Sequence, residues 1–514
     1  MNILDLPDEI LLCILNKLNN IDILYSLVNV NQRFDRLALD SIYIRDLDFT
    51  VNDISEECHQ FFDRFSTSIL PRIHHQIKKL TLEQFLIERL LYIVDYPQLY
   101  SLSLVFSQPE TIFKYLIGDT ILIRLLTKQI THFNLKINSR TIESFDRYEP
   151  TLFAMILSFA KCLTDFTFLQ SIRDPLINSI FNLFSTNCVS STLTKLKIEV
   201  NTLDDCLYIL DGRFDCLSTL IIDIETIGPQ LWNIDTTKKI SKLKYFSLTS
   251  TSRTSYYHEL VPLFRRMTNL EELTLFLFVK RIKSTYIDGI HLNDEILIHM
   301  PRLNKFTFSI TTLVCNRNSN IILPSNDDIQ RSFIERRCQQ IGSYADDNTM
   351  KIRARCHIYS LPYQFDMFHN VTNSFKGAIF DKVRSVIIID DIRPFEYEFF
   401  QIISQSFPFL QTLSIQNNEP QKYKKYSFKF ITFPHLNVLN LELAHIDYIE
   451  QFLFERKIHL PCLLHLTIQY DSLVMITNNF TNNPTYFNFA KLKTLLTDKA
   501  FVRPENFHLY FPRL

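Results

Sequence analysis

A short pattern of apolar residues recurs through most of the chain at a nearly constant interval. Each copy reads apolar-x-x-apolar-x-apolar, as in Leu193/Leu196/Ile198 and Leu436/Leu439/Leu441. First positions at 193, 217, 243, 270 and 303, and again at 383, 410, 436, 463 and 492, follow one another at 24 to 33 residues. A period of this size is typical of arrays in which each unit packs on its neighbours. The spacing therefore predicts a repeat array over most of the 514 residues, where length alone would suggest three or four separate domains.

The stretches between triplets carry the helical period. Apolar residues near a 3.6-residue spacing occur in three of them, at Tyr257 to Met267, Phe395 to Phe407 and Ile446 to Leu453. A strand followed by a helix and a return to a parallel neighbour is the unit of a solenoid. We therefore predict an α/β fold with parallel strands and outer helices.

Proline recurs at a fixed position relative to the triplets. It precedes the first triplet position by two residues, where it should end a helix and turn the chain into the next strand. The copies are Tyr96-Pro97-Gln98-Leu99, Met300-Pro301-Arg302-Leu303, Phe407-Pro408-Phe409-Leu410, Phe433-Pro434-His435-Leu436 and Leu460-Pro461-Cys462-Leu463. A sixth copy, Phe511-Pro512-Arg513-Leu514, stands at the end of the sequence. We expect the natural protein either to continue past Leu514 or to cover its last repeat with a partner.

The first forty-five residues carry a different pattern, that of three short helices. Pro7, followed by two acidic residues, predicts the start of the first helix. Asp22 is the expected cap of the second helix, and Asn31 that of the third, over 32–39. So small a unit cannot bury all of its apolar side chains internally. Either the rest of the chain or another protein must cover the remainder.

The order of residues in this stretch resembles the F-box family over roughly 4–40. The matching phrases are Leu6-Pro7-x-Glu9-Ile10, Ile14-x-x-x-Leu18, Leu24 and Val28-Asn29-Val30-Asn31-x-Arg33-Phe34-x-x-Leu37-Ala38. Phe34 stands where many relatives have Trp. The resemblance implies a three-helix module that binds the Skp-type adaptor of cullin-RING ubiquitin ligases. The residues it implies in adaptor binding are Leu6, Pro7, Ile10, Leu11, Ile14, Leu18, Leu24, Val28, Val30, Arg33 and Phe34. The sequence does not separate those that face the adaptor from those that face each other.

The repeat array in turn resembles the leucine-rich repeats that follow many F-boxes. Its period matches or slightly exceeds the usual 20 to 29 residues. The Asn or Cys usual three positions after the strand triplet is mostly absent, with Asn418 an exception. The expected organisation is an F-box at 1–45, a helical linker and first irregular repeat at 46–95, a regular array at 96–310, an irregular repeat with an insertion at 311–376, and a second array at 377–514.

The irregular segment has its own expected elements. We predict a polar run over 315–328, a helix around Ser332 to Ile341, and a strand in which Ile352, Ala354, Cys356 and Ile358 alternate with other residues. Insertions of this kind either bind partners or are plain connecting loops.

Composition argues against catalysis and cofactors. The six glycines are too scattered for a phosphate-binding loop or a nucleophile elbow. Ten cysteines include no Cys-x-x-Cys pair, so we expect free thiols and no metal site. With 54 basic and 55 acidic residues, no global field favours nucleic acid or a membrane. The sequence shows neither a signal peptide nor a membrane span, which predicts a location in the cytoplasm, the nucleus or both.

One local cluster is strongly basic. Four lysines alternate with aromatic residues over 422–429, which suits either an acidic partner or a solvated connecting loop.

Two functions remain. In the first, the protein is a non-catalytic receptor that holds the ligase adaptor with its F-box and a protein substrate, of unknown identity, with its repeats, for ubiquitin-dependent degradation. In the second, it is a repeat scaffold without a ligase role, whose N-terminal helices only cap the array.

Overall fold

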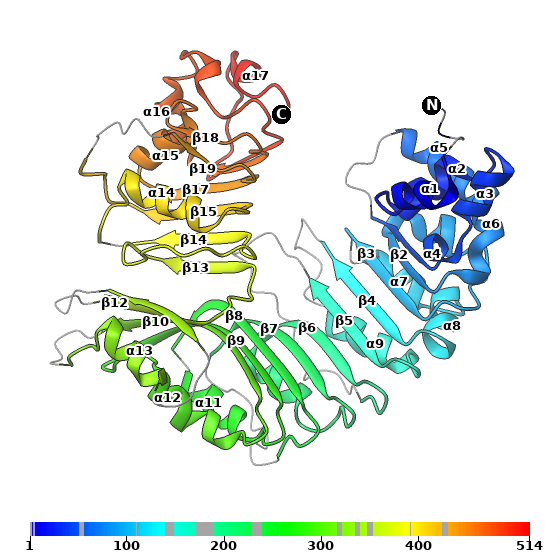
Figure 1. Ribbon diagram of the computed structural model, residues 1–514, viewed down its shortest axis with the longest axis horizontal. Helices are drawn as coiled ribbons and strands as arrows, with labels where there is room; N and C mark the ends of the chain where they lie inside the picture. The colour runs from blue at the N-terminus through cyan, green and yellow to red at the C-terminus, as the bar shows by residue number, and fades with distance from the viewer. Residues whose placement is uncertain are drawn as a thin grey trace. The chain divides into compact units, whose positions relative to one another are not determined.

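The computed structural model describes residues 3, 6–50, 56–108, 110–138, 149–170, 189–228, 239–255, 257–315, 321–334, 340–346, 353–390, 392–423 and 430–514 (Figure 1). The chain forms two compact units. The first unit comprises Met1–Phe276 and Glu295–Phe306, and the second comprises Leu277–Asp294 and Thr307–Leu514. Within the described ranges, no helix has the length and apolar character that crossing a bilayer requires.

The first unit opens with four short helices. They are α1 (Asp8–Leu15), α2 (Asn20–Leu27), α3 (Gln32–Ala38) and α4 (Ser41–Ile44). Asn31 caps α3, as predicted, by accepting the N–H of Phe34 at 2.9 Å. The prediction that Asp22 caps the second helix is wrong. That helix starts earlier, and Asn19 caps it by accepting the N–H of Ile21 at 2.9 Å.

A run of parallel strands follows directly on α4. Its members are β1 (Asp46–Phe49), β2 (Lys79–Glu83), β3 (Ser101–Phe106), β4 (His132–Ile137), β5 (Asp165–Gln170), β6 (Lys195–Thr202), β7 (Thr219–Thr226) and β8 (Tyr245–Thr254), each paired with the next. The connecting helices and short helical turns are α5 (Glu56–Arg64), η2 (Phe65–Ile69), α6 (Leu70–Ile73), η3 (His74–Gln76), η4 (Gln84–Leu86), η5 (Ile87–Leu91), α7 (Glu110–Leu116), α8 (Ile121–Lys128), α9 (Glu149–Phe159), α10 (Leu203–Ile209), α11 (Tyr257–Arg265) and η8 (Leu297–His299). The chain passes between the units within β9 (Glu272–Ile282), α12 (Gly289–Glu295) and β10 (Lys305–Cys315).

The second unit begins with antiparallel strands. Strand β12 (Arg353–Ser360) pairs antiparallel with both β10 and β11 (Ile341–Ala345). It coincides with the predicted alternating strand. The helix predicted around Ser332 to Ile341 begins earlier, because α13 spans Asn326–Ile334, and Ile341 lies in β11. Residues 335–339 of this prediction lie outside the described residues. Ser325 and Asp328 form the reciprocal cap that starts it, at 3.1 and 3.2 Å.

The rest of the second unit is a parallel sheet. Its strands run in the order β13 (Met367–Val371), β14 (Ser385–Ile389), β15 (Thr412–Asn417), β17 (Val438–Ala444), β19 (His465–Ile468) and β20 (Thr494–Thr497). The connecting elements are α14 (Tyr397–Ser406), α15 (Ile446–Leu453), α16 (Tyr470–Thr477), η9 (Pro484–Tyr486), α17 (Phe507–Tyr510) and a small pair, β16 (Ile431–Thr432) with β18 (Ile458–His459). In Figure 1, α14, α15 and α16 lie on one side of this sheet. Their inward side chains, such as Phe400, Tyr448 and Ile449, share one buried core with the strands.

The triplets and the proline phrases fall where the sequence predicts. The second and third triplet positions lie on strands. They are buried in every copy except that Phe306 is half-exposed, as are Leu495 and Thr497 in the copy that begins at 492. Each proline phrase forms a tight turn, in which the carbonyl before proline accepts the N–H of the following leucine. Leu410 N–H bonds Phe407 O at 3.1 Å, and Leu514 N–H bonds Phe511 O at 3.2 Å. Proline suits the second position of such a turn because its φ is preset.

Candidate functional site

Helix α1 is apolar on two sides, and only one side is covered. Leu11 and Leu15 are buried at 2% and 7% exposure. Ile10, Ile14 and Leu18 remain 47%, 44% and 53% exposed. Ile10 and Ile14 are one helical turn apart, and Leu18 continues their line in the turn that ends α1. We call these three residues the exposed α1 row.

The start of α1 is tied to α3 by charge. Asp8 accepts a hydrogen bond from Arg33 Nε at 2.7 Å and another from Arg36 at 2.5 Å. Arg33 also donates to the carbonyl of Leu6. The hydrogen bond from Arg33 is the main reason that the pKa of the Asp8 carboxyl lies below its ordinary value. This clamp orients α1, although each charge is partly solvated, so that it contributes little to stability.

The residues that the sequence implicated in adaptor binding divide into a core and a surface. Leu11, Leu24, Val28 and Phe34 are buried inside the four-helix unit. Pro7 and Val30 are exposed, with the exposed α1 row, while Leu6 and Arg33 are half-buried. The sequence reasoning missed one exposed apolar residue nearby, Ile42 on α4, which is 60% exposed. Ile42 could not be identified from the spacing of apolar residues, because α4 is a single turn.

The opposite side of the four-helix unit rests on the rest of the first unit. Helices α2 and α4 pack against β1. Tyr25 of α2 stacks on Phe61 of α5 at 4.2 Å between ring centroids, and Asn20 donates to the carbonyl of Asp46 at 3.0 Å. The downstream chain therefore covers one side of this unit and leaves the exposed α1 row open.

The structure also brings a serine and a histidine together. Ser309 Oγ lies 2.9 Å from His357 Nε2, and the hydroxyl of Tyr344 lies 3.1 Å from His357 Nδ1. A hydroxyl beside an imidazole can serve as a nucleophile and its base when a substrate reaches it. Here Ser309 and His357 are 2% and 1% exposed, inside a cluster of aromatic rings around Phe368. The arrangement is a hydrogen-bonded part of the core.

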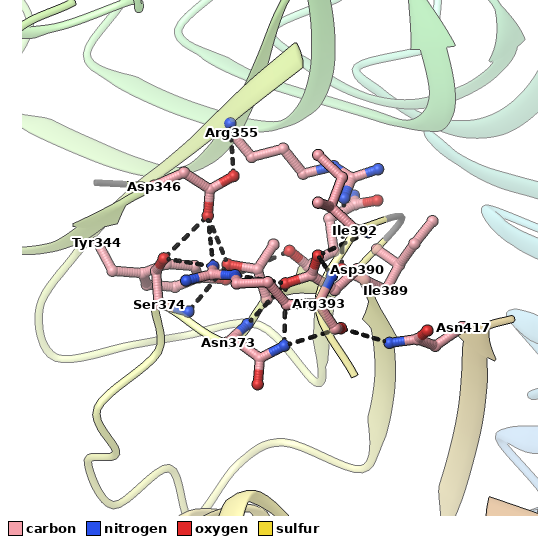
Figure 2. A network of polar contacts seen from close by, with 12 residues as sticks. Tyr344, Asp346, Arg355, Asn373, Ser374, Ile389, Asp390, Ile392, Arg393 and Asn417 are labelled. Carbon is pink, nitrogen blue, oxygen red and sulfur yellow. Dashed lines mark hydrogen bonds and ion pairs between the residues drawn. The ribbon is translucent and has the colours of Figure 1, made fainter. Parts of the chain in front are cut away.

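A second polar group joins the β11–β12 hairpin to the parallel sheet. Figure 2 shows Arg393 between two carboxylates, 3.3 Å from Asp346 and 3.3 Å from Asp390. Asp346 also accepts hydrogen bonds from Thr372 and Ser374, at 3.2 and 2.9 Å. The hairpin is held to β10 by its own strand ladder, and among the described residues no ladder joins β12 to β13. This network and the aromatic cluster therefore connect the hairpin to the parallel sheet.

Burial and hydrogen bonding act in opposite directions on Asp390. Burial alone would raise the pKa of its carboxyl. Hydrogen bonds from Asn373 and from the backbone of Arg393 and Ile392, together with the charge of Arg393, outweigh burial and hold the pKa below its ordinary value. Asp390 is therefore ionised at neutral pH, and its buried negative charge depends on the positive charge of Arg393.

The basic cluster and a metal-binding group are the two remaining candidates for a site. Most of the basic cluster, residues 424–429, lies outside the described residues; the backbone N–H of Lys422 bonds Glu396 at 3.0 Å. In the part of the chain that the structure describes, no group of three or more His, Cys, Asp or Glu side chains is arranged to hold a metal ion.

Comparison with known proteins adds no relative. No protein-family model matches the chain, and no curated protein sequence matches it significantly.

Proposed function

We propose that the protein is a non-catalytic receptor of a Skp-cullin-F-box type ubiquitin ligase. The N-terminal helices would bind the Skp-type adaptor in the manner of an F-box, and the parallel strand–helix units, which resemble leucine-rich repeats, would hold a protein substrate. Ubiquitin transfer would then be accelerated by proximity, because the bound substrate is held at high effective concentration near the charged carrier.

The observation that carries the proposal is the exposed α1 row. Three large aliphatic side chains stand in line on a unit that already has its own core and its own clamp. Full burial of such a side chain contributes about 1.5–3 kcal/mol, and about half of each one is still open to be covered. The row also occupies positions at which the F-box resemblance places adaptor contacts.

The alternative is a scaffold in which the N-terminal helices only cap the strand array. The packing of α2 and α4 on β1 favours it, because that packing covers the outermost strand of the first sheet. A cap accounts for the buried side of the unit and gives no role to the exposed α1 row.

Co-precipitation with the adaptor separates the two functions. We expect the full chain to retain a purified Skp-type adaptor, and the variant with Leu6→Ala, Pro7→Ala and Ile14→Asp to lose it. These residues are exposed or half-buried, so the circular dichroism spectrum of the variant should match that of the unchanged protein. Adaptor binding that persists in a folded variant would remove the F-box assignment and leave the scaffold.

A further inference from the structure

The parallel sheet of the second unit has an outward face that is almost free of charge. In the register of β14, β15, β17, β19 and β20, the side chains opposite the helices form three rows. The rows are Ser385, Thr412, Val438, His465 and Thr494; Ile387, Ser414, Asn440, Thr467 and Leu496; and Ile389, Gln416 and Leu443. No Asp, Glu, Lys or Arg stands at these positions. We call them the neutral face.

The corresponding sheet face of the first unit carries many charged residues. The charged residues at its paired positions are Asp46, Asp48, Lys79, Glu83, Lys136, Asp165, Lys195, Lys197, Glu199 and Asp223. Some form ion pairs along the row, such as Lys195 with Asp165 at 2.8 Å. A solvated sheet face is therefore charged elsewhere in this same protein, and the neutral face is a local departure.

The neutral face is accessible and partly apolar. Leu443 and Leu496 are 52% and 58% exposed, and Ile387 and Ile389 are half-buried by their neighbours. Ionisable groups border it at several places. His465 lies in the first row, and Glu442 sits in the bulge of β17, where its N–H bonds Asn440. Asp498 directly follows β20, and Arg355 donates to the carbonyl of Ile389 at 3.3 Å. The guanidinium of Arg384 lies 5.2 Å above the ring of Phe409.

Electrostatics determines what such a surface can hold. A charged side chain placed over the three rows would lose hydration and find no counter-ion among the row residues, which costs free energy. Aliphatic and hydroxyl-bearing side chains lose little hydration there, and the exposed leucines gain cover. We propose that the neutral face is the substrate-binding surface, and that it takes an extended protein segment whose contacting side chains are uncharged. This inference rests on the proposed receptor function and specifies its substrate class.

A displayed peptide library tests the proposal directly. The probe is a library of random peptides about 12 residues long, enough to cross five strands at about 3.3 Å per residue, selected on the full chain. We expect the selected peptides to be depleted in Asp, Glu, Lys and Arg relative to the library. A synthetic copy of a selected peptide should bind at least about tenfold more weakly to the Ser414→Asp, Thr467→Asp variant, measured by fluorescence polarisation.

The matched control places the same two charges on the first sheet. Ser103→Asp and Thr167→Asp introduce them at half-buried paired positions there, and binding should stay within about twofold. Charged selected peptides, equal effects of both variants, or no selection at all would overturn the proposal. Adaptor binding should be unchanged in both variants, so a chain that binds peptides but not the adaptor would refute the receptor function alone.

Discussion

Replacing Arg393 with methionine should lower the free energy of unfolding of the second unit by about 2–4 kcal/mol. The side chains of Asp346 and Asp390 are 9% and 6% exposed, and Arg393 is the cation bonded to both. Removing one partner of a buried ion pair costs about 3–5 kcal/mol because the other charge is left uncompensated. Arg393 is itself 37% exposed, so solvent screening reduces the expected loss. Methionine keeps the aliphatic part of the side chain.

Hydrogen exchange of the β13 and β14 amides would measure this loss within the second unit. The control is a double-mutant cycle with Asp346→Asn, in which the same arginine substitution should cost clearly less, since one of the two charges is gone. A loss below about 0.5 kcal/mol in the unchanged background would mean that the network does not hold the hairpin.

Acid should destabilise the second unit before its carboxylates are protonated. Burial lowers the pKa of His357 to about 3 and that of His369 to about 4, from 6.5 when unfolded. Below pH 6.5 the unfolded chain therefore binds protons that the folded chain does not. The free energy of unfolding then falls by up to about 1.4 kcal/mol per pH unit for each histidine. Between pH 6.5 and pH 5 the expected loss is about 1.6 kcal/mol per histidine.

Denaturant titrations at pH 7, 6 and 5 test this dependence. The His357→Gln variant should lose about 2 kcal/mol less than the unchanged protein over this range, because only His369 of these two histidines then remains. His435→Gln, at an exposed position, is the matched control and should follow the unchanged protein. Parallel pH profiles for the unchanged protein and His357→Gln would contradict the account.

The sequence predicted the elements whose signals are local and periodic. Triplets such as Leu439/Leu441 fell on strands, the three helical stretches became α11, α14 and α15, and each proline phrase became a turn. The same triplet also describes strands that were not singled out, such as β1 with Leu47 and Phe49. Periodicity succeeds here because each unit buries the same face against its neighbours.

The antiparallel segment could not be predicted in this way, because its partners are distant in sequence. The alternation over β12 correctly marked Ala354, Cys356 and Ile358 as buried, and it implied an open opposite face. In the structure Arg355 and His357 on that face are buried as well. Their partners include Ser309 and Ile389, brought to them by the fold. The alternation of apolar with polar residues gives no sign that the polar face is buried as well.

The N-terminal helices show a different limit. Apolar residues surround α1, so the sequence alone could not say that Leu11 and Leu15 face inward while Ile10 and Ile14 face out. The contacts of α1 with α3 and α4, between Asp8 and Arg33 and between Asn16 and Tyr43, orient the helix, and no local pattern encodes them.

The central claim is that the exposed α1 row is a protein-binding surface, and titration calorimetry with a purified Skp-type adaptor tests it most directly. The unchanged protein should bind one adaptor per chain, and Ile10→Asp with Ile14→Asp should weaken binding by about 100-fold or more, since the two carboxylates would lose hydration in an apolar contact without a counter-ion. The matched control is Ile117→Asp, which alters a similarly exposed isoleucine after α7 and should leave the affinity unchanged. Equal affinities for the α1 variant and the unchanged protein, or no binding by the unchanged protein, would contradict the account.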